Sequence, residues 1–265
     1  FTLVQFFKQC NFFFAIKFVC ECIGISYYYD FDKSLPKSLI ITRLLTSSVN
    51  GDKPTEEKPI KRISENILNY YRPYVNDLFY NDSIPYEVQQ EFEIGYDEQT
   101  NRITIPIRDE IGSLVGVKGR WFGNINDNIE KYIYLEPCSK SQILYGLYKT
   151  YDSIKEQQLV YVVEAEKGVL QMFSYGITNV VATCGKQVSQ SQIDKLSRLC
   201  VDICFLFDKD VSFNELKELS NKFVNKSKIM CAIDNDNILT EKESPTDNYK
   251  KLKHLLDNNI VVLKG

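Results

Sequence analysis

Apolar residues between residues 63 and 92 recur at helical spacing. Apolar side chains stand three or four positions apart there, which is the period of a helix with one buried face. Pro85 follows the polar triplet 81–83, and proline is favoured in the first turn of a helix. The pattern therefore predicts helical structure in this segment, with a second helix that begins at or just after Pro85.

The period changes after residue 100. Two apolar runs, 102–107 and 113–117, are separated by a turn at 109–112 that contains a glycine. This arrangement predicts a β-hairpin. Pro106 has no N–H to donate, so the first strand is expected near the edge of its sheet.

Short apolar runs alternate with helical patterns from residue 158 onward. Ser189 and Ser212 are followed three positions later by Gln192 and Glu215, which is the spacing of a capping box at the start of a helix. Apolar strands that alternate with helices predict a parallel α/β sheet. The predicted strands are 159–164, 179–184, 203–208, 229–234 and 260–263, and the predicted helices are 166–174, 189–199, 212–224 and 246–257.

The beginning of the chain has a different character. Residues 1–29 are rich in aromatic residues and predict two short helices, the second opening near Asn11, but polar residues interrupt them too often for a membrane span. Residues 30–62 turn polar and contain three prolines, which indicates a linker. We therefore expect a helical end piece, this linker, an α+β subdomain over 63–157 and an α/β subdomain over 158–265. The start without Met, and without a basic segment, is interpreted as that of a fragment.

Composition narrows the function classes. The chain has 265 residues, of which 44% are hydrophobic and 25% are charged, so a globular protein is expected. With 32 Lys and Arg against 35 Asp and Glu the net charge is −3, and any nucleic-acid binding must come from a local arrangement of basic residues. The single histidine and the lack of a Cys-x-x-Cys pair exclude the common zinc motifs, and the eight cysteines are expected to be mostly buried and reduced.

Carboxylates follow three of the predicted strands. Glu164 follows one strand, Asp208 and Asp210 follow another, and Asp234 follows a third. Because ligands of an open α/β sheet bind at the carboxyl ends of its strands, these acids are expected to share a cleft. Carboxylates held close together repel one another unless cations neutralise them, which favours a Mg²⁺ site. The alternative is that these acids only end strands in loops, as Asp often does.

Several segments together resemble the DnaG-type primases of bacteria and phages, whose catalytic part contains a Toprim domain. Residues 101–120 are similar to a primase segment with a Phe-Pro-Ile strand, a glycine turn and a Gly-Gly-Arg strand, and residues 131–147 to its Lys-Tyr and Leu-Tyr-Gly-Leu stretch. The remaining similarities are those of 163–168 to the Toprim Glu motif, 181–185 to its Ala-Thr-Leu-Gly strand, 208–210 to its Asp-x-Asp motif and 243–247 to its later acidic motif.

The chain departs from the Toprim pattern in three places beside the acids. Ala165 stands where the Glu motif has Gly, and Gly168 stands where it has Asp. Val211, Ser212 and Phe213 follow the Asp-x-Asp motif, where Ala-Gly is usual. The Ala-Glu-Lys variant is similar to primases of phages and mobile elements, and the principal acids are all present.

The resemblance implies DNA-templated synthesis of RNA primers for DNA replication, by nucleotidyl transfer to a 3′-hydroxyl. Two Mg²⁺ or Mn²⁺ ions about 4 Å apart would hold the hydroxyl and the triphosphate, since phosphoryl transfer depends mainly on positioning and charge neutralisation. Glu164, Asp208 and Asp210 are the implied catalytic residues. The implied metal ligands are Asp208, Asp210 and Asp247, with Glu164 either completing the set or assisting deprotonation of the hydroxyl.

Three acids compete for the third metal-ligand position. Asp234 lies nearest to its strand. Thr246 follows Pro245 and is a predicted N-cap, which would hold Asp247 in the first turn of a helix. The resemblance also favours Asp247, while Glu243 can share the role.

The resemblance assigns Arg120, Lys131 and Lys140 to contacts with template phosphates and with the nucleotide triphosphate. Arg102 and Lys118 are weaker candidates, because basic residues of strands often only protect a sheet edge. The implied partners are a single-stranded DNA template, ribonucleoside triphosphates and a replicative helicase, in the cytoplasm of a bacterial or phage-infected cell and with no membrane. Zinc is expected only in a zinc-ribbon module upstream of residue 1, with a Cys/His quartet.

Two other functions stay open. A Toprim nuclease or topoisomerase fragment would use the same acids to cleave DNA, but it leaves residues 101–147 unexplained. A degenerate primase that binds nucleic acid without synthesis is compatible with Ala165, Gly168 and Phe213. A primer-synthesis assay separates these possibilities.

Overall fold

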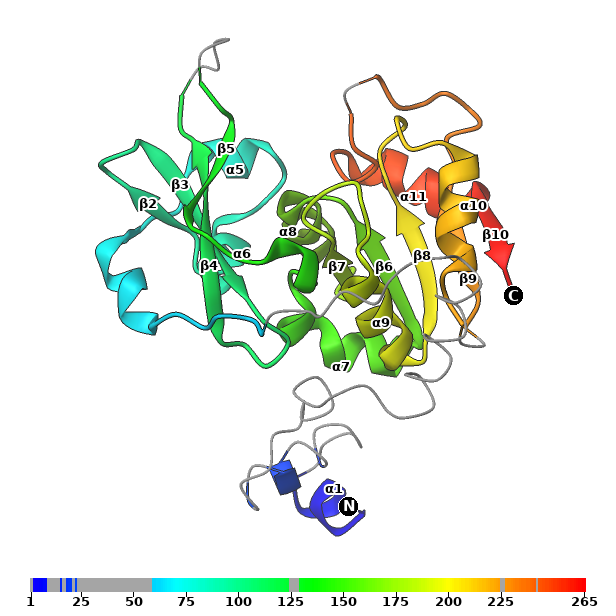
Figure 1. The fold of residues 1–265 in the computed structure, drawn as a ribbon, viewed down its shortest axis with the longest axis horizontal. Coiled ribbons are helices and arrows are strands. Elements are labelled where there is room, and N and C mark those ends of the chain that lie inside the picture. The colour runs from blue at the N-terminus through cyan, green and yellow to red at the C-terminus, as the bar shows by residue number, and fades with distance from the viewer. Residues whose placement is uncertain are drawn as a thin grey trace. The chain divides into compact units, whose positions relative to one another are not determined.

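The structure is a computed structural model that describes residues 2–8, 15, 18–20, 22, 59–123, 129–224, 227–241 and 243–265. The chain divides into two compact units, residues 1–59 and 60–265 (Figure 1). In the first unit, α1 (Thr2–Lys8) is the first of the two short helices expected there. Most of the second expected helix and of the expected linker lies outside the described residues.

Helices and a short strand alternate at the start of the second unit. The 3-10 helix η1 (Glu65–Tyr70) is followed by β1 (Arg72–Pro73), α5 (Asp77–Asn81) and α6 (Tyr86–Glu91). Pro85 stands directly before α6, so the expected start of this helix is confirmed. The helical structure predicted over 63–92 is confirmed only in part, because β1 interrupts it.

The first sheet of this unit is antiparallel, with the strand order β1-β2-β3-β4-β5. β3 (Arg102–Arg108) and β4 (Leu114–Trp121) form the expected hairpin. β2 (Gly95–Asp97) and β5 (Tyr132–Glu136) pair with the outer sides of this hairpin. Every residue of β3 is buried, as suits the middle strand of a sheet.

Pro106 does not lie in an edge strand, contrary to the expectation from the sequence. β3 lies between β2 and β4, but β2 pairs with β3 only from Arg102 to Thr104. Pro106 stands two residues beyond this pairing, opposite Val117 of β4. Its missing N–H therefore costs no hydrogen bond to β2, and this explains why a central strand tolerates a proline.

The second sheet contains the strands expected after residue 158, in the order β10-β9-β8-β6-β7. Helix α7 (Leu147–Gln157) leads into this sheet (Figure 1). Both expected capping boxes, at Ser189 and Ser212, are present. The strands are β6 (Leu159–Val163), β7 (Val180–Ala182), β8 (Asp202–Leu206), β9 (Ile229–Ala232) and β10 (Ile260–Lys264), and the helices between them are α8 (Glu166–Ser174), α9 (Gln190–Leu199), α10 (Phe213–Asn221) and α11 (Tyr249–Asn258).

The last strand departs from the fully parallel sheet that the sequence predicted. β6, β7, β8 and β9 pair in parallel, but β10 is antiparallel to β9. Asn259, the residue between α11 and β10, bonds through its backbone and its side chain to Ile233 at the carboxyl end of β9. The chain therefore enters β10 at the end where β9 finishes, and it has to run back along that strand.

The start of α11 also differs from the expectation. Its N-cap is Asn248, whose side chain accepts from the N–H groups of Lys250 and Lys251, and not Thr246. Asp247 consequently precedes the helix instead of lying in its first turn. Thr246 is fully buried, and its hydroxyl donates a 2.9 Å hydrogen bond to Gln171 of α8.

Helix α8 joins the two sheets through a shared core. Buried residues of β3, such as Ile103 and Ile105, belong to the same apolar cluster as Val169 and Met172 of α8 and Val163 of β6. Because β6 and α8 lie on either side of residue 164, this packing fixes the loop that carries Glu164.

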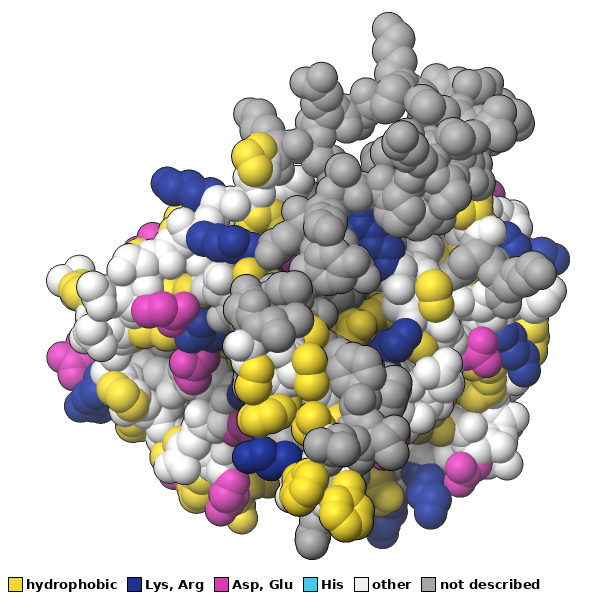
Figure 2. All heavy atoms as spheres, turned by 90° about the horizontal axis from the view of Figure 1, so that it is seen from below, with side chains coloured by type: hydrophobic (Ala, Val, Ile, Leu, Met, Phe, Trp, Pro, Cys, Tyr) yellow, Lys and Arg dark blue, Asp and Glu magenta, His cyan; other side chains and the backbone are white. Residues whose placement is uncertain are grey.

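Charged and hydrophobic side chains are distributed differently over one face of the molecule. Positive and negative side chains are interspersed over the face shown in Figure 2, and hydrophobic side chains gather at its lower centre. Among the described residues, no helix is both long enough and apolar enough to cross a membrane.

Candidate active site

Two of the predicted acids are bonded to each other across neighbouring parallel strands. Glu164 directly follows β6, and Asp208 and Asp210 follow β8, which pairs with β6 in parallel. The N–H of Asp208 donates a 3.1 Å hydrogen bond to Oε1 of Glu164. The N–H of Gly185, after β7, donates a 2.9 Å bond to the carbonyl oxygen of Glu164. Loops that follow three adjacent strands therefore meet at Glu164.

The carboxylates of Glu164 and Asp208 lie in an excess of negative charge. Burial and the nearby charges of Asp208 and Asp210 raise the pKa of Glu164, against the lowering effect of the Asp208 N–H and of Lys186. Burial and the charges of Asp210 and Asp247 likewise raise the pKa of Asp208. A cation at this position is favoured, because it would relieve both the repulsion and the loss of hydration.

Asp247 lies close enough to affect Asp208, but it is neutralised by its own partners. Oδ1 of Asp247 lies 2.7 Å from the ammonium group of Lys167 and accepts a 3.1 Å hydrogen bond from Gln171. Oδ2 accepts a 3.0 Å bond from the N–H of Ser244. Burial raises the pKa of Asp247, but these bonds outweigh burial and lower it below the usual value.

The two rival acids for the third metal position have structural partners. Asp234 accepts 2.9 Å hydrogen bonds from the N–H groups of Ile238 and Leu239 and forms a 2.7 Å ion pair with Lys209. Its side chain is only 3% exposed. Glu243 forms a 2.6 Å ion pair with Lys251. Asp234 closes a turn, and of the three acids only Asp247 appears among the charges that act on Asp208.

The donor set suits a hard divalent cation, because carboxylate oxygens are the ligands that Mg²⁺ and Mn²⁺ prefer. Burial raises the pKa values of Glu164 and Asp208, and the charges of neighbouring carboxylates raise them further. Across the part of the chain that the structure describes, however, no three His, Cys, Asp or Glu side chains are placed so as to hold one ion together.

Lys131 is influenced by charges from both sheets. It precedes β5, and burial together with the positive charges of Arg120 and Lys167 lowers its pKa, while Asp82 and Asp247 oppose this. The guanidinium group of Arg120, in β4, donates a 3.2 Å hydrogen bond to the carbonyl of Trp121. The buried Nε of Arg120 has no hydrogen-bond partner among the described residues. Of the predicted basic residues, Lys131 is thus the one whose charge interacts with both Arg120 and Asp247.

The other predicted basic residues have different surroundings. Arg102 is buried, and its guanidinium group donates to the carbonyl oxygens of Gly119, Lys131 and Glu130. Lys118 forms a 2.7 Å ion pair with Glu166 at the start of α8, with side chains 13% and 2% exposed. Lys140 is exposed, and a Cβ atom on Gly185 would lie 3.9 Å from its ammonium nitrogen. Lys140 therefore lies near the loop that is bonded to Glu164.

Three charged residues at the site were not singled out from the sequence. Lys186 forms an ion pair with Asp210, Lys167 pairs with Asp247, and Glu166 pairs with Lys118. The rule that pointed to the acids would also have pointed to Lys186, because this residue closely follows the strand predicted at 179–184. Glu166 and Lys167 offered no comparable signal, since charged residues in the first turn of a helix are common.

Gly168 lies where α8 comes close to both β6 and the loop before α11. A Cβ atom at this position would lie 3.2 Å from the hydroxyl oxygen of Thr246 and 3.2 Å from Cγ2 of Val163. These distances are shorter than ordinary van der Waals contacts, so a larger residue requires its neighbours to move.

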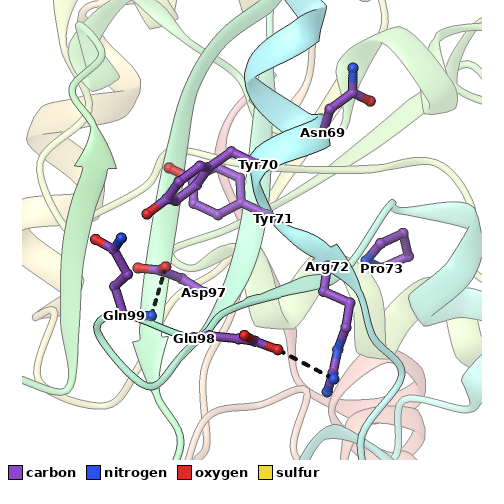
Figure 3. A pocket seen from close by; sticks show the side chains of 8 residues that line it. All are labelled: Asn69, Tyr70, Tyr71, Arg72, Pro73, Asp97, Glu98 and Gln99. Carbon is purple, nitrogen blue, oxygen red and sulfur yellow. Dashed lines mark hydrogen bonds and ion pairs between the residues drawn. The ribbon is translucent and has the colours of Figure 1, made fainter.

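A pocket of about 500 Å³ lies elsewhere on the antiparallel sheet (Figure 3). Tyr70, Tyr71 and Asp97 line it, together with Arg72 and Glu98, which form a 3.3 Å ion pair. None of the predicted acids or basic residues lines this pocket. It is therefore separate from the candidate active site.

Comparisons with known proteins find similarity to a prophage protein and to DNA primases. No family model matches the chain. The sequence is 28% identical over 231 residues to an uncharacterized protein, YorJ, that derives from the SPbeta prophage of Bacillus subtilis, covering 75% of this chain and 61% of that protein. It is 37% identical over 113 residues to the DNA primase of Aquifex aeolicus, covering 41% of this chain and 22% of that primase. The chain thus spans about three fifths of the first relative and about a fifth of the second.

Solved structures decide the fold. The structure of the zinc-binding and RNA polymerase domains of Aquifex aeolicus primase matches with a TM-score of 0.62 and 23% identity, covering 93% of this chain and 71% of that chain. A DnaG primase catalytic domain bound to single-stranded DNA matches with a TM-score of 0.61 and 18% identity, covering 75% of this chain and 78% of that chain. The chain has the fold of a DnaG-type primase core.

The primase resemblance inferred from the sequence and the mixed α/β fold class are therefore confirmed. The phage context inferred from the Ala-Glu-Lys variant agrees with the prophage origin of one relative. The primase fold accounts for the antiparallel sheet and the second sheet together. A fold with the second sheet alone would leave the antiparallel sheet unexplained.

Proposed function

We propose that this chain synthesises RNA primers on a single-stranded DNA template by transferring nucleotides to a 3′-hydroxyl. The observation that carries the proposal is the meeting of two sets of side chains in one place. Asp247, in the loop before α11, acts electrostatically on Asp208, which follows a parallel strand. Lys131, which precedes β5 of the antiparallel sheet, is influenced by the charges of both Asp247 and Arg120. A site for nucleotidyl transfer needs both, because the metal ligands and the phosphate contacts act on the same triphosphate.

The acids are proposed to hold the divalent cations. Asp208, Asp210 and Asp247 would be the metal ligands, with Glu164 as a catalytic residue beside them. Mg²⁺ or Mn²⁺ would neutralise the triphosphate and favour the ionised 3′-hydroxyl. The protein positions these carboxylates through the Asp208 to Glu164 hydrogen bond and through the bonds of Asp247 to Ser244 and Gln171.

Phosphate contacts are proposed for Arg120, Lys131 and Lys140. The buried and unpartnered Nε of Arg120 supports this role, since a buried donor without a partner is costly and a phosphate oxygen would satisfy it. Arg102 and Lys118 are left out of the proposed contacts, because the carbonyl oxygens and Glu166 already occupy their donors.

A primer-synthesis assay tests the proposal. The chain is incubated with labelled ribonucleoside triphosphates, a single-stranded DNA template and Mg²⁺ or Mn²⁺, and the products are separated by length. We expect short RNA products that depend on the template and vanish in Asp208→Asn, while the exposed control Asp257→Asn keeps them. Cleavage of the template without RNA products would identify a nuclease instead, and binding of the template without products would identify a non-catalytic module.

Further partners are expected by analogy alone. A replicative helicase and an upstream zinc-ribbon module stay predictions. A pull-down with the full-length protein tests the helicase, and a Cys/His quartet shortly upstream of residue 1 in the full reading frame tests the zinc ribbon.

A further inference from the structure

Lys186 lies among the acids of the candidate site on a loop that the primase resemblance did not single out. It follows Gly185, between β7 and α9, and its ammonium group forms an ion pair with Asp210. Its positive charge also lowers the pKa of Glu164 and of Asp208. One lysine therefore acts on three of the four proposed carboxylates.

The pair between Lys186 and Asp210 is accessible to solvent. Their side chains are 57% and 54% exposed. An exposed ion pair of this kind contributes little to stability, and its partners exchange readily with ions from solution. Lys167 differs, because it is only 23% exposed and lies between Asp247 at 2.7 Å and Asp82 at 3.8 Å.

Lys186 and a divalent cation compete for the same carboxylate oxygen. The ammonium group is bonded to Oδ2 of Asp210, which a cation would need in order to use Asp210 as a ligand. A cation that binds there would repel Lys186. The side chain would then stay beside the acids on a flexible stem, with its three N–H donors free.

We propose that Lys186 neutralises the acids in the free protein, leaves Asp210 when a divalent cation binds, and then contacts the phosphates of the incoming nucleotide. This inference rests on the proposed function, whose nucleotide and metal it shares. A displaced ammonium group next to a metal-bound triphosphate is well placed for such a contact, because lysine binds phosphate as a mobile point charge.

The first test measures Mn²⁺ binding without nucleotide or template, by titration calorimetry at low ionic strength. Lys186→Met keeps the length of the side chain and removes its charge. Loss of one competing charge is expected to tighten Mn²⁺ binding about fivefold. Lys186→Arg should bind Mn²⁺ as the wild type does, and Lys253→Met, an exposed lysine of α11, is the matched control for removal of one positive charge.

The second test measures ATP binding at saturating Mn²⁺. Lys186→Met is expected to bind ATP about tenfold more weakly, the scale of one charged hydrogen bond, whereas Lys186→Arg keeps most of the affinity. If Lys186 had only a structural role, Lys186→Met would not be expected to tighten Mn²⁺ binding and weaken ATP binding at the same time.

Two results would overturn the inference. Equal or weaker Mn²⁺ binding by Lys186→Met would show that Lys186 does not compete with the cation, and unchanged ATP binding would show that it does not contact phosphate. Neither readout needs primer synthesis. A chain that passes both binding tests but makes no RNA would refute the proposed function and leave the role of Lys186 standing.

Discussion

The backbone N–H of Asp208 and the side chain of Glu164 are joined by a 3.1 Å hydrogen bond. The bond uses the main chain of Asp208, so the carboxylate of Asp208, which is hydrogen-bonded to the Ser244 side chain, takes no part in it. It also means that replacing the Asp208 side chain leaves the link between the two strand ends in place.

Asp208→Asn is therefore expected to separate activity from folding. Primer synthesis should fall by about 100-fold or more, the scale of removing one electrostatic group from an active site. The thermal unfolding midpoint should stay close to that of the wild type, because no core volume is lost and the bond to Glu164 is kept. Undiminished synthesis would refute the metal assignment.

Asp247→Asn is expected to affect the metal requirement of synthesis, and Asp234→Asn the stability of the fold. Asp247→Asn should raise the Mn²⁺ concentration needed for synthesis far more than Asp234→Asn does. Asp234→Asn should instead lower the free energy of unfolding by about 2 kcal/mol, because it weakens the hydrogen bonds that close the turn after β9 and the ion pair with Lys209. A metal titration and a urea titration of both variants check this, and the reverse order in the metal titration would make Asp234 the ligand.

Removal of charge at Arg120 or Lys131 should weaken binding of the template or the nucleotide. Lys131→Ala should raise the nucleotide concentration needed for synthesis more than it lowers stability. The salt dependence of single-stranded DNA binding should become less steep in any variant that has lost a phosphate contact. If the slope is unaltered in both variants, neither residue contacts the template phosphates.

The pair of Lys118 and Glu166 is expected to make stability depend on pH at the alkaline end. Burial lowers the pKa of Lys118, but the charge of Glu166 and its hydrogen bond outweigh this and raise it above the usual value. The pair therefore stabilises the fold fully below the pKa of an unfolded lysine, and this contribution is lost as the pH rises through the raised pKa.

Substitution tests the same pair. Glu166→Gln should lower the free energy of unfolding by about 3 kcal/mol, because it leaves a buried ammonium group without its counter-ion. The double variant Lys118→Met with Glu166→Gln should lose less than the sum of the single variants, as measured by urea unfolding. Strict additivity would contradict a direct coupling between the two side chains.

The raised pKa values of Glu164 and Asp208 should depend on Asp210. The charge of Asp210 contributes to both shifts, so Asp210→Asn is expected to lower both pKa values toward those of ordinary carboxylic acids. Carbon-13 NMR titration of the carboxyl groups without divalent ions measures this. Carboxyl pKa values that are the same in Asp210→Asn as in the wild type would contradict the charge coupling. Protons also compete with the metal, so Mn²⁺ binding by the wild type should weaken as the pH falls through the raised pKa of Asp208.

Much of the fold could be predicted because period and capping act locally. The strands and helices after residue 158 follow apolar runs, and the capping boxes at Ser189 and Ser212 fix two helix starts. The direction of β10 and the central place of β3 could not be predicted, because they depend on pairing between distant segments. Asn259 and Thr104 carry no local sign of these pairings.

The candidate site was predictable in its acids but not in their partners. A strand end places Glu164 and Asp208 in one region whatever the rest of the chain does. The pairing of Asp247 with Lys167 depends instead on how the long loop before α11 packs against α8. Thr246 in this loop bonds to Gln171 of α8 and does not form the predicted N-cap.

Residues 168 and 246 are not free to vary independently. A side chain at 168 would press on the Thr246 hydroxyl, and that hydroxyl is bonded to Gln171, which in turn bonds to Asp247. An aspartate at 168, which the related motif has there, therefore requires neighbours such as Thr246 to shift, and a shift of Thr246 is passed through Gln171 to Asp247. The effect of Gly168→Asp on the acidic site should consequently depend on which residue stands at 246.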